Sequence, residues 1–266
     1  MTMLYLSHMI PEYEVNTSMD SSPLEDNLVQ FPSTVVKPKR VSPALARKGM
    51  KQEVYPFKKE EQIKAMQRYF LSQMKEATTT NKKKQALRNW LWFSLGINIG
   101  YRGGDVCQLK WGDVLNPDYS VKTDAYNYIT EEKTSKHRQL IFNEDCKRVI
   151  SFYLTASRER PDLEDYIFPS QKGGHMENKC YGEILKRAAK EVGIPFNVNT
   201  HSLRKTFGYR YYKATGDLAT LQRLFNHGDS LVTLRYIGID AELLQAAYER
   251  VNGAILNDEE LNSYLD

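Results

Sequence analysis

Apolar residues follow no period in the first fifty positions and a helical period from about Tyr55 onwards. Proline and serine interrupt residues 1–50 repeatedly, and no apolar run there exceeds a short helix. This pattern predicts an irregular N-terminal arm that is partly disordered. Between residues 58 and 75 the apolar positions recur at spacings of three and four, which predicts one buried helix face. Those positions are Ile63, Met66, Phe70 and Met74.

A second helix is predicted after the three lysines at 82–84, and its apolar stripe is unusually broad. Its members are Leu87, Trp90, Leu91, Trp92, Phe93 and Leu95. Such a stripe is typical of a helix at the centre of a core. Gly96 and Gly100 mark its expected end, and Gly103-Gly104 mark a break before a short helix at 105–109.

Two short runs then carry strand signals. Residues 126–130 alternate polar and apolar, 138–142 become apolar towards their end, and the polar stretch 131–137 between them predicts a hairpin. Helical periods return afterwards at 145–156, 180–192, 203–213, 218–225, 231–236 and 241–251. The predicted fold class is therefore mainly α with a small antiparallel β-sheet (α+β). The predicted organisation is an arm at 1–50, a folded domain at 51–238 and an acidic C-terminal helix and tail at 239–266.

Composition places the chain among globular proteins. Of 266 residues, 41% are hydrophobic, enough for a substantial core. The longest nearly apolar stretch, 89–100, is too short to span a bilayer, and the N-terminus lacks the pattern of a signal peptide. Cys107, Cys146 and Cys180 stand far apart, which argues against a disulfide framework or a zinc knuckle. We therefore expect a cytoplasmic protein with no membrane partner and no metal site.

The net charge of +4 conceals a division along the chain. Residues 51–236 hold 31 basic and 21 acidic side chains, a net of +10. Residues 237–266 hold one basic and seven acidic side chains, a net of −6. The basic part is suited to a polyanion and the acidic part to a basic protein surface.

The residues with the clearest chemistry lie between 200 and 236. His201 and Arg204 share a helix face, and His227 and Tyr236 follow. Imidazole and guanidinium groups can bind phosphate oxygens and stabilise the extra charge of a five-coordinate phosphorus. A tyrosine can be the nucleophile, and the leaving oxygen then requires an acid.

Two residues earlier in the chain fit the same chemistry. Arg102 stands at a predicted helix end beside glycines, where a phosphate can approach closely. Lys133, at the polar hairpin tip, is a candidate acid. Each signal alone has an ordinary structural explanation, since helix-end arginines are commonly solvated and Tyr236 is one of 17 tyrosines. The combination makes phosphoryl chemistry the better interpretation.

The combination resembles the tyrosine recombinase (phage integrase) family from about Tyr55 to Gly238. Gly100-Tyr101-Arg102 with Asp105 is similar to the first family box, and Lys133 falls at the family's hairpin lysine. His201-Ser202-Leu203-Arg204 matches the His-x-Leu-Arg box. Phe225-Asn226-His227 stands for Leu-Gly-His, with Asn226 replacing glycine. Thr233 and Tyr236 match the terminal tyrosine box.

The resemblance implies a site-specific DNA recombinase or integrase that uses no metal and no nucleotide cofactor. Tyr236 would attack a phosphodiester and form a 3′-phosphotyrosyl bond. The phosphate would be held by Arg102, His201, Arg204 and His227, with Asp105 in support, and Lys133 would protonate the leaving 5′-oxygen. Double-stranded DNA would be the substrate, exchanged by a homo-tetramer whose C-terminal helix packs on a neighbouring protomer.

Several alternatives stay open. The C-terminal helix could instead pack on its own domain in a monomer. The fifty irregular residues cannot form the helical core-binding domain that usually precedes the catalytic domain. A short form, a fragment, or a clamp around DNA that comes from elsewhere would each explain this. A DNA-binding accessory or defective element remnant, or a type IB topoisomerase, would also carry parts of this pattern. Arg210, Lys213 and Arg223 are the predicted contacts to the DNA backbone.

Overall fold

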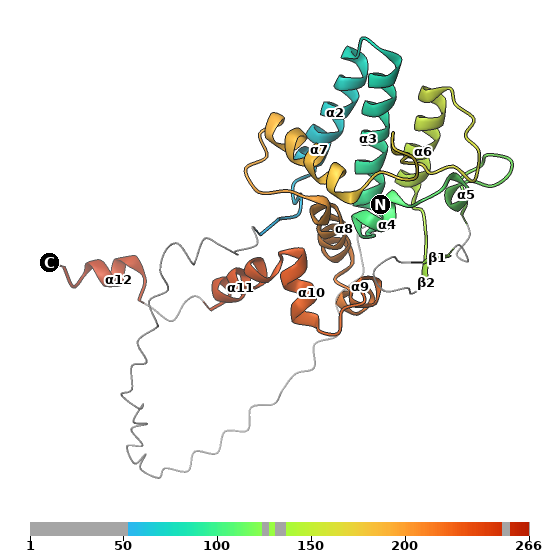
Figure 1. Cartoon of the computed structure of the whole chain (residues 1–266). Helices are drawn as coiled ribbons and strands as arrows, with labels where there is room; N and C mark the ends of the chain where they lie inside the picture. Colours follow the sequence, from blue (N-terminus) through green and yellow to red (C-terminus); the bar gives the residue numbers. More distant parts are fainter. Residues whose placement is uncertain (1–52, 124–127, 131–136, 252–255, 266) are drawn as a thin grey trace, which may run out of the picture. The chain divides into compact units, whose positions relative to one another are not determined.

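The computed structural model describes residues 53–123, 128–130, 137–251 and 256–265 (Figure 1). The chain divides into two units at residue 50, and the described residues all belong to the second. Its helices before the hairpin are α2 (Glu60–Glu76), α3 (Thr80–Ile99), α4 (Gly103–Cys107) and α5 (Trp111–Val114). Those after it are α6 (Glu144–Ser157), α7 (Asn178–Glu191), α8 (Thr200–Thr215), α9 (Leu218–Phe225), α10 (Ser230–Ile237), α11 (Asp240–Glu249) and α12 (Asp258–Asn262).

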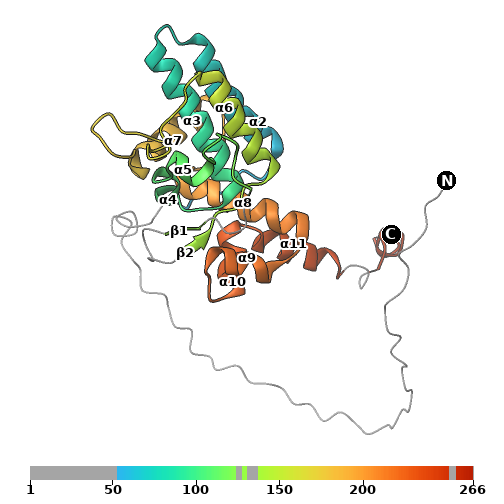
Figure 2. The ribbon, with the colours of Figure 1, turned by 90° about the vertical axis from the view of Figure 1, so that its right-hand side faces the viewer.

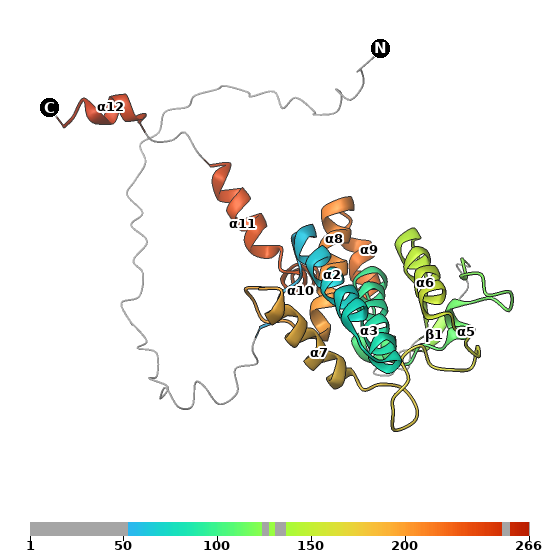
Figure 3. The same cartoon turned by 90° about the horizontal axis from the view of Figure 1, so that it is seen from above.

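Helix α3 is the centre of the core, as its broad apolar stripe predicts. It packs against α2, α6 and α8, and Figure 3 shows it running between α2 and α6. On α3, Trp92 stacks on Tyr181 of α7 with ring centres 4.2 Å apart. Nearly every side chain from Ala86 to Ile99 is buried, because neighbouring helices cover α3 on several sides.

The end of α3 lies at Gly100 and not at Gly96. Gly100 adopts the left-handed conformation, φ +64°, that commonly ends a helix. Gly96 lies inside α3, where an added Cβ would come within 2.6 Å of Leu203 Cδ1 on α8. The prediction that Gly96 ends the helix is therefore wrong, because this glycine serves the close approach of two helices instead.

The two predicted strands of the hairpin are present in the described residues, and the second ends earlier than its sequence pattern. Residues 126–127 and 131–136 lie outside the described residues. Strands β1 (Tyr128–Thr130) and β2 (His137–Gln139) pair antiparallel, with Ile129 opposite Arg138. Residues 140–142 lie outside the strand, although Leu140 and Phe142 are buried in the core. The hydroxyl of Tyr101 donates to the carbonyl of Gln139 at 2.8 Å, which fastens β2 to the residue beside Arg102.

Helices α8 to α11 form a second group, gathered together in Figure 2. Their contacts bury a small core made of Leu221, Phe225, Ile237 and Ile239. The sequence pattern predicted each of these helices, but not α5 and α12, which are too short to show a period. The predicted class, mainly α with a small antiparallel sheet, is confirmed for the described residues.

The three cysteines and the hydropathy of the helices bear on two expectations from composition. Cys107 and Cys146 are buried and Cys180 is exposed, and none of the three takes part in a disulfide within the described residues. Among the helices that the structure describes, none combines the length and hydropathy that crossing a membrane requires.

Candidate active site

Arg102 is placed by the tight connection between α3 and α4. After the left-handed turn at Gly100, Arg102 occupies the N-cap position of α4 in an extended conformation and is half-buried. The next residue, Gly103, lies directly against α7 and α8. A Cβ at Gly103 would collide with Asn178 Oδ1 and come within 2.8 Å of Thr200 Cβ. The glycine therefore lets Arg102 approach the start of α8.

Arg204 is the most deeply buried charged residue of the site, with 3% of its surface exposed. Its guanidinium donates to the carbonyl of Gly100 at 2.7 Å and to the carbonyl of Phe225 at 3.1 Å. It also lies over the Phe225 ring, 4.3 Å from the ring centre. These contacts join the ends of α3 and α9 to α8 and hold the guanidinium in one orientation, since a buried charge requires hydrogen-bond partners.

His227 follows a left-handed residue at the end of α9. Asn226 takes φ +52° there, so asparagine adopts the backbone conformation expected where the family has glycine. The Nδ1 of His227 lies 3.1 Å from the hydroxyl of Thr233, which itself donates to the carbonyl of Asp229. Burial lowers the pKa of His227, and the positive charges of Arg204 and Arg102 lower it further.

Tyr236 lies on α10 and is partly buried among aromatic rings. Its ring meets His227 edge-on at 5.2 Å and Phe225 edge-on at 5.5 Å between ring centres. Burial raises the pKa of Tyr236, but the charges of Arg204 and Arg102 and a hydrogen bond from Arg204 oppose that rise. The phenol is therefore protonated at neutral pH, with two guanidinium groups close enough to stabilise a phenolate.

Four of the predicted site residues come together in this way: Arg102, Arg204, His227 and Tyr236. They derive from four different helix ends or faces, separated by up to 134 positions in the chain. Two cations and one imidazole around a phenol can bind an anion and stabilise charge that develops on it. The geometry thus suits attack by the phenol oxygen on a phosphodiester.

The other predicted site residues have different surroundings. His201 is exposed on the first turn of α8, where its backbone N–H donates to the capping Asn199 at 2.8 Å. Asp105 is buried in the first turn of α4. Lys133 lies outside the described residues. The strands on either side of its position are held near Arg102, since Arg138 of β2 lies 3.8 Å from the centre of the Tyr101 ring.

The three predicted DNA contacts are all exposed and lie on α8 and α9. Lys213 has an acidic neighbour, with its Nζ 3.6 Å from Glu242 Oε2. Arg210 lines a groove together with Lys58 and Asn98, and Arg223 stands in the last turn of α9. Their role in DNA binding stays a prediction.

Sequence reasoning missed one residue that touches the candidate nucleophile. The Nζ of Lys205 lies 5.3 Å from the centre of the Tyr236 ring and donates to the carbonyl of Val54 at 2.7 Å. Its position directly after Arg204 was visible, but its partners are 31 and 151 positions away. Within the described ranges, His, Cys, Asp and Glu form no group of three or more suited to hold a metal ion.

Known proteins are similar to this chain over most of its length. The model of the phage integrase family matches residues 64–242. The chain is similar to the probable integrase/recombinase YoeC of Bacillus subtilis (strain 168), with 34% identity over 201 residues, covering 75% of this chain and 98% of that protein. It is 27% identical to tyrosine recombinase XerC of Xylella fastidiosa (strain 9a5c), over 61% of this chain and 52% of that protein. The chain thus spans about half the length of XerC.

Solved structures share the fold. The XerA recombinase superposes with a TM-score of 0.54 and 21% identity, over 81% of this chain and 70% of that one. The XerH site-specific recombinase bound to difH substrate gives a TM-score of 0.52 and 19% identity, over 74% of this chain and 53% of that one. At these identities the likeness concerns the fold.

Proposed function

The chain belongs to the phage integrase family, and from that premise we propose that it is a site-specific recombinase that cleaves and rejoins double-stranded DNA through Tyr236. The observation that carries the proposal is the enclosure of one phenol by two guanidinium groups and an imidazole. A tyrosine with an ordinary structural role does not require such surroundings. DNA is also the substrate that best matches the net charge of +10 over residues 51–236.

Each bond and proton of the cleavage step can be assigned to a residue of the chain or to the DNA. The phenol oxygen of Tyr236 attacks phosphorus and forms a P–O bond, while the bond to the 5′-oxygen breaks. The phenol proton passes to a base, a role for which we propose His201. The 5′-oxygen leaves with a proton, for which we propose Lys133. The products are a 3′-phosphotyrosyl bond and a free 5′-hydroxyl.

Charge stabilisation is the contribution of the remaining residues. Arg102, Arg204 and His227 would bind the non-bridging oxygens, whose charge grows in the transition state. Arg204 is already oriented by two backbone carbonyls, so little reorganisation is required when the phosphate arrives. Asp105, buried in the first turn after Arg102, would support the position of that arginine.

Rejoining is the same step in reverse, with a 5′-hydroxyl as the nucleophile. When this hydroxyl comes from another DNA strand, the strands are exchanged. The phosphotyrosyl bond retains the energy of the broken phosphodiester, so rejoining requires no nucleotide cofactor. The substrate is DNA of the cell or of a mobile element, which places the activity in the cytoplasm.

Exchange between two DNA sites requires several protomers, and we propose a homo-tetramer assembled through the C-terminal segment 239–266, next to a catalytic domain at 51–238. The support is that α11 leaves Leu243 (41%), Leu244 (56%) and Tyr248 (78%) exposed, as is Val251 (78%) just after its end. An apolar helix face of this kind is typical of a protein interface. Leu244→Glu should reduce assembly on DNA, measured by sedimentation of the protein–DNA complex.

The test of the activity uses nicked duplexes that tile the DNA flanking the coding region. A nick beside the cleaved bond lets a short 5′-hydroxyl fragment diffuse away, which traps the covalent adduct. The wild-type protein should give an adduct resistant to boiling in detergent, Tyr236→Phe none, and the control Tyr166→Phe, outside the candidate site and the C-terminal segment, a normal amount. An adduct from Tyr236→Phe, or none from wild type on any duplex, would show the assignment to be wrong.

Two further measurements distinguish a recombinase from a topoisomerase and test Lys133 as the acid. Relaxation of a supercoiled plasmid without formation of four-way junctions would indicate a topoisomerase in place of a recombinase. Lys133→Ala should slow cleavage of ordinary DNA and leave cleavage of a 5′-bridging phosphorothiolate unchanged, since a thiolate leaves without a proton. Equal losses of cleavage rate on both substrates would show that Lys133 is not the acid.

A further inference from the structure

The segment that precedes α2, residues 53–59, is bound along α8 and is called here the lead-in segment. The N–H of Tyr55 donates to the carbonyl of Asn197 at 3.2 Å, and the N–H of Phe57 donates to the buried hydroxyl of Thr206 at 2.8 Å. Phe57 is fully buried and meets Phe93 of α3 edge-on, with ring centres 5.8 Å apart. The backbone of this segment is therefore fixed relative to α8.

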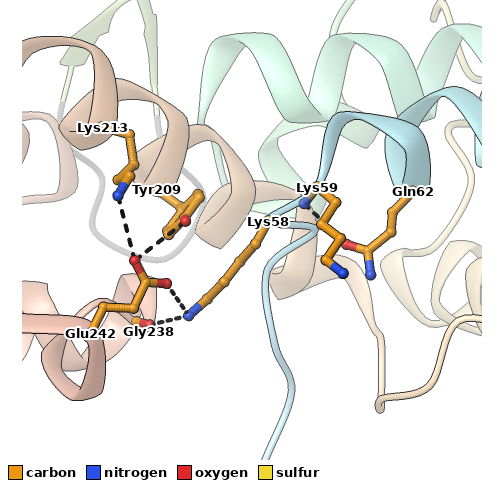
Figure 4. A network of polar contacts seen from close by, with 7 residues as sticks. All are labelled: Lys58, Lys59, Gln62, Tyr209, Lys213, Gly238 and Glu242. Carbon is orange, nitrogen blue, oxygen red and sulfur yellow. Dashed lines mark hydrogen bonds and ion pairs between the residues drawn. The ribbon is translucent and has the colours of Figure 1, made fainter. Parts of the chain in front are cut away.

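The last part of the lead-in segment holds the end of the helix that carries Tyr236. The Nζ of Lys58 donates to the carbonyl of Gly238 at 2.6 Å and to Glu242 Oε1 at 2.7 Å (Figure 4). Gly238 is the left-handed C-cap of α10, two residues after Tyr236. A Cβ there would lie 3.5 Å from Pro56 Cδ, so the lead-in segment also packs on this turn.

Glu242 makes this contact a network and not a single pair. Its other carboxylate oxygen lies 3.5 Å from the Tyr209 hydroxyl and 3.6 Å from Lys213 Nζ, both on α8 (Figure 4). Partial burial opposes ionisation of Glu242, but the hydrogen bond and charge of Lys58, together with Lys213 and Tyr209, outweigh it and lower the pKa of the carboxyl. The carboxylate is therefore charged at neutral pH.

The first part of the lead-in segment reaches the nucleophile through Lys205. This ammonium donates to the carbonyl of Val54 and lies 5.3 Å from the centre of the Tyr236 ring. Burial lowers the pKa of Lys205, and the nearby Glu53 opposes that change. One lysine thus contacts both the lead-in segment and the aromatic face of Tyr236, at a distance typical of cation–π contacts.

We propose that Lys58 and Lys205 are positioning residues for Tyr236, and that through them the lead-in segment sets the place of the nucleophile. The inference rests on the proposed function, since it takes Tyr236 as the nucleophile. Lys58 fixes the end of α10 along its axis, and Lys205 fixes the ring. Helix α10 has only eight residues, so a small shift at either contact moves the phenol oxygen directly.

The expected size of the effect follows from the sensitivity of catalysis to geometry. A displacement of about 1 Å away from the reacting groups can reduce a rate by ~10²-fold. Loss of either lysine should therefore slow formation of the phosphotyrosyl adduct by ~10-fold or more, with DNA affinity unchanged.

The test compares Lys58→Met and Lys205→Met, each of which keeps an unbranched apolar chain and removes the charge. The matched control is Lys59→Met, the exposed lysine beside Lys58. The probe is the nicked duplex that the wild-type protein cleaves, and the measurements are the single-turnover adduct rate at saturating protein, the Kd for the duplex and the melting temperature. We expect the two variants to be at least ~10-fold slower and the control unchanged.

Conservative variants separate positioning from a general structural role. Lys58→Arg and Lys205→Arg keep the donors and should restore the rate to within ~3-fold of wild type, a recovery that follows from the retained hydrogen bonds. Should Lys58→Met not fold, Glu242→Gln removes the ionic partner alone and should slow the reaction by ~3-fold, the smaller effect of one screened pair.

Three results would overturn the inference: wild-type adduct rates in both methionine variants, arginine variants as slow as the methionine variants, or a loss confined to Kd. A wild-type adduct rate in Glu242→Gln would show that Lys58 does not position Tyr236. Absence of any adduct from the wild-type protein is a different result, because it refutes the proposed function itself.

Discussion

The hydroxyl of Thr233 fixes the orientation of the His227 ring. This hydroxyl lies 3.1 Å from His227 Nδ1 and 3.2 Å from the carbonyl of Asp229, so it stands between the imidazole and the backbone of the same turn. Because Nδ1 is engaged by Thr233, Nε2 is the ring nitrogen that would face a phosphate.

Thr233→Val tests this arrangement. Valine has the shape of threonine but makes no hydrogen bond, so the imidazole loses its orientation and Nδ1 loses its partner. We expect the adduct rate to fall ~10-fold, as for a misplaced charge-stabilising group, and stability to fall by about 1 kcal/mol. Thr155→Val is the matched control, because Thr155 on α6 makes the same bond to the carbonyl four residues earlier. Similar adduct rates in both variants would contradict the assignment.

The lowered pKa of His227 gives a pH dependence of stability with a defined sign. The unfolded histidine titrates near pH 6.5 and the folded one lower, so between these values the unfolded chain binds more protons. This contribution to stability is fully present above about pH 6.5 and is lost as the pH falls through the folded pKa. It should be below ~1 kcal/mol, because the imidazole is partly solvated.

The measurement is the change in melting temperature between pH 7.5 and pH 5.5, compared between wild type and His227→Gln. The wild type should lose more stability on acidification than the variant, which has no imidazole to protonate at this position. An identical pH dependence in the two proteins would show that His227 does not titrate as described.

At the scale of elements, close contact between short helices places the site, and two glycines of neighbouring helices illustrate it. Gly103 begins α4 directly after Arg102 and touches α7 and α8 without space for a Cβ. Gly182, inside α7, has ordinary room, since a Cβ there would meet only Thr200 Cγ2 at 3.9 Å. The same substitution at these positions should therefore have opposite consequences.

Gly103→Ala should reduce stability by ~1–3 kcal/mol, the usual cost of overpacking, and should slow adduct formation because α4 moves Arg102 away from Arg204. Gly182→Ala should increase stability by ~0.5–1 kcal/mol, since alanine is the better helix former. Chemical denaturation measures both changes. A stable, fully active Gly103→Ala protein would contradict the close contact between α4, α7 and α8.

The elements themselves were largely predictable from the sequence, because their signals are local. Apolar spacing located α2, α3 and α6 to α11, usually within a few residues of their ends. The start of α8 was placed three residues late, at Leu203 instead of Thr200, because the cap at Asn199 was not recognised. The four-residue α5 is too short for a period to appear.

Contacts between distant segments were not predictable in this way. The motifs identified Arg102, Arg204, His227 and Tyr236, and the structure brings these four together. Lys58 and Lys205, by contrast, look like ordinary surface lysines in the sequence. Their partners are Gly238, Glu242 and Val54, up to 184 positions away, and no local pattern connects residues at that separation.

At the scale of the whole molecule, the basic and acidic parts of the chain meet at two places that the structure describes. Glu242, from the segment with a net charge of −6, lies against Lys58 and Lys213 of the basic part. Asp240 Oδ2 of the same segment lies 3.9 Å from Arg235 Nε. Two carboxylates of that segment are thus paired with basic side chains within the chain. The other acidic side chains of α11 and α12 remain exposed or half-exposed at the surface.

The net charge of +10 over residues 51–236 predicts a strong dependence of DNA binding on salt. If ~6–10 phosphates are contacted, the Kd should rise by ~10³–10⁵ between 50 and 200 mM salt. Fluorescence anisotropy with a labelled duplex measures the slope of log Kd against log salt. Arg210→Gln and Arg223→Gln should each reduce that slope by about 1 if they contact phosphates. A slope near zero would contradict electrostatic binding.

The hydrogen bond between Phe57 and Thr206 forms late during synthesis of the chain. A ribosome adds ~5–20 residues per second, so the 149 positions between these partners take roughly 7 to 30 s to translate. Throughout that time the N–H of Phe57 lacks its acceptor on α8, and Tyr236 has yet to be made. The lead-in segment therefore reaches its place on α8 only near the end of synthesis, and binding by a chaperone would be most useful in this interval.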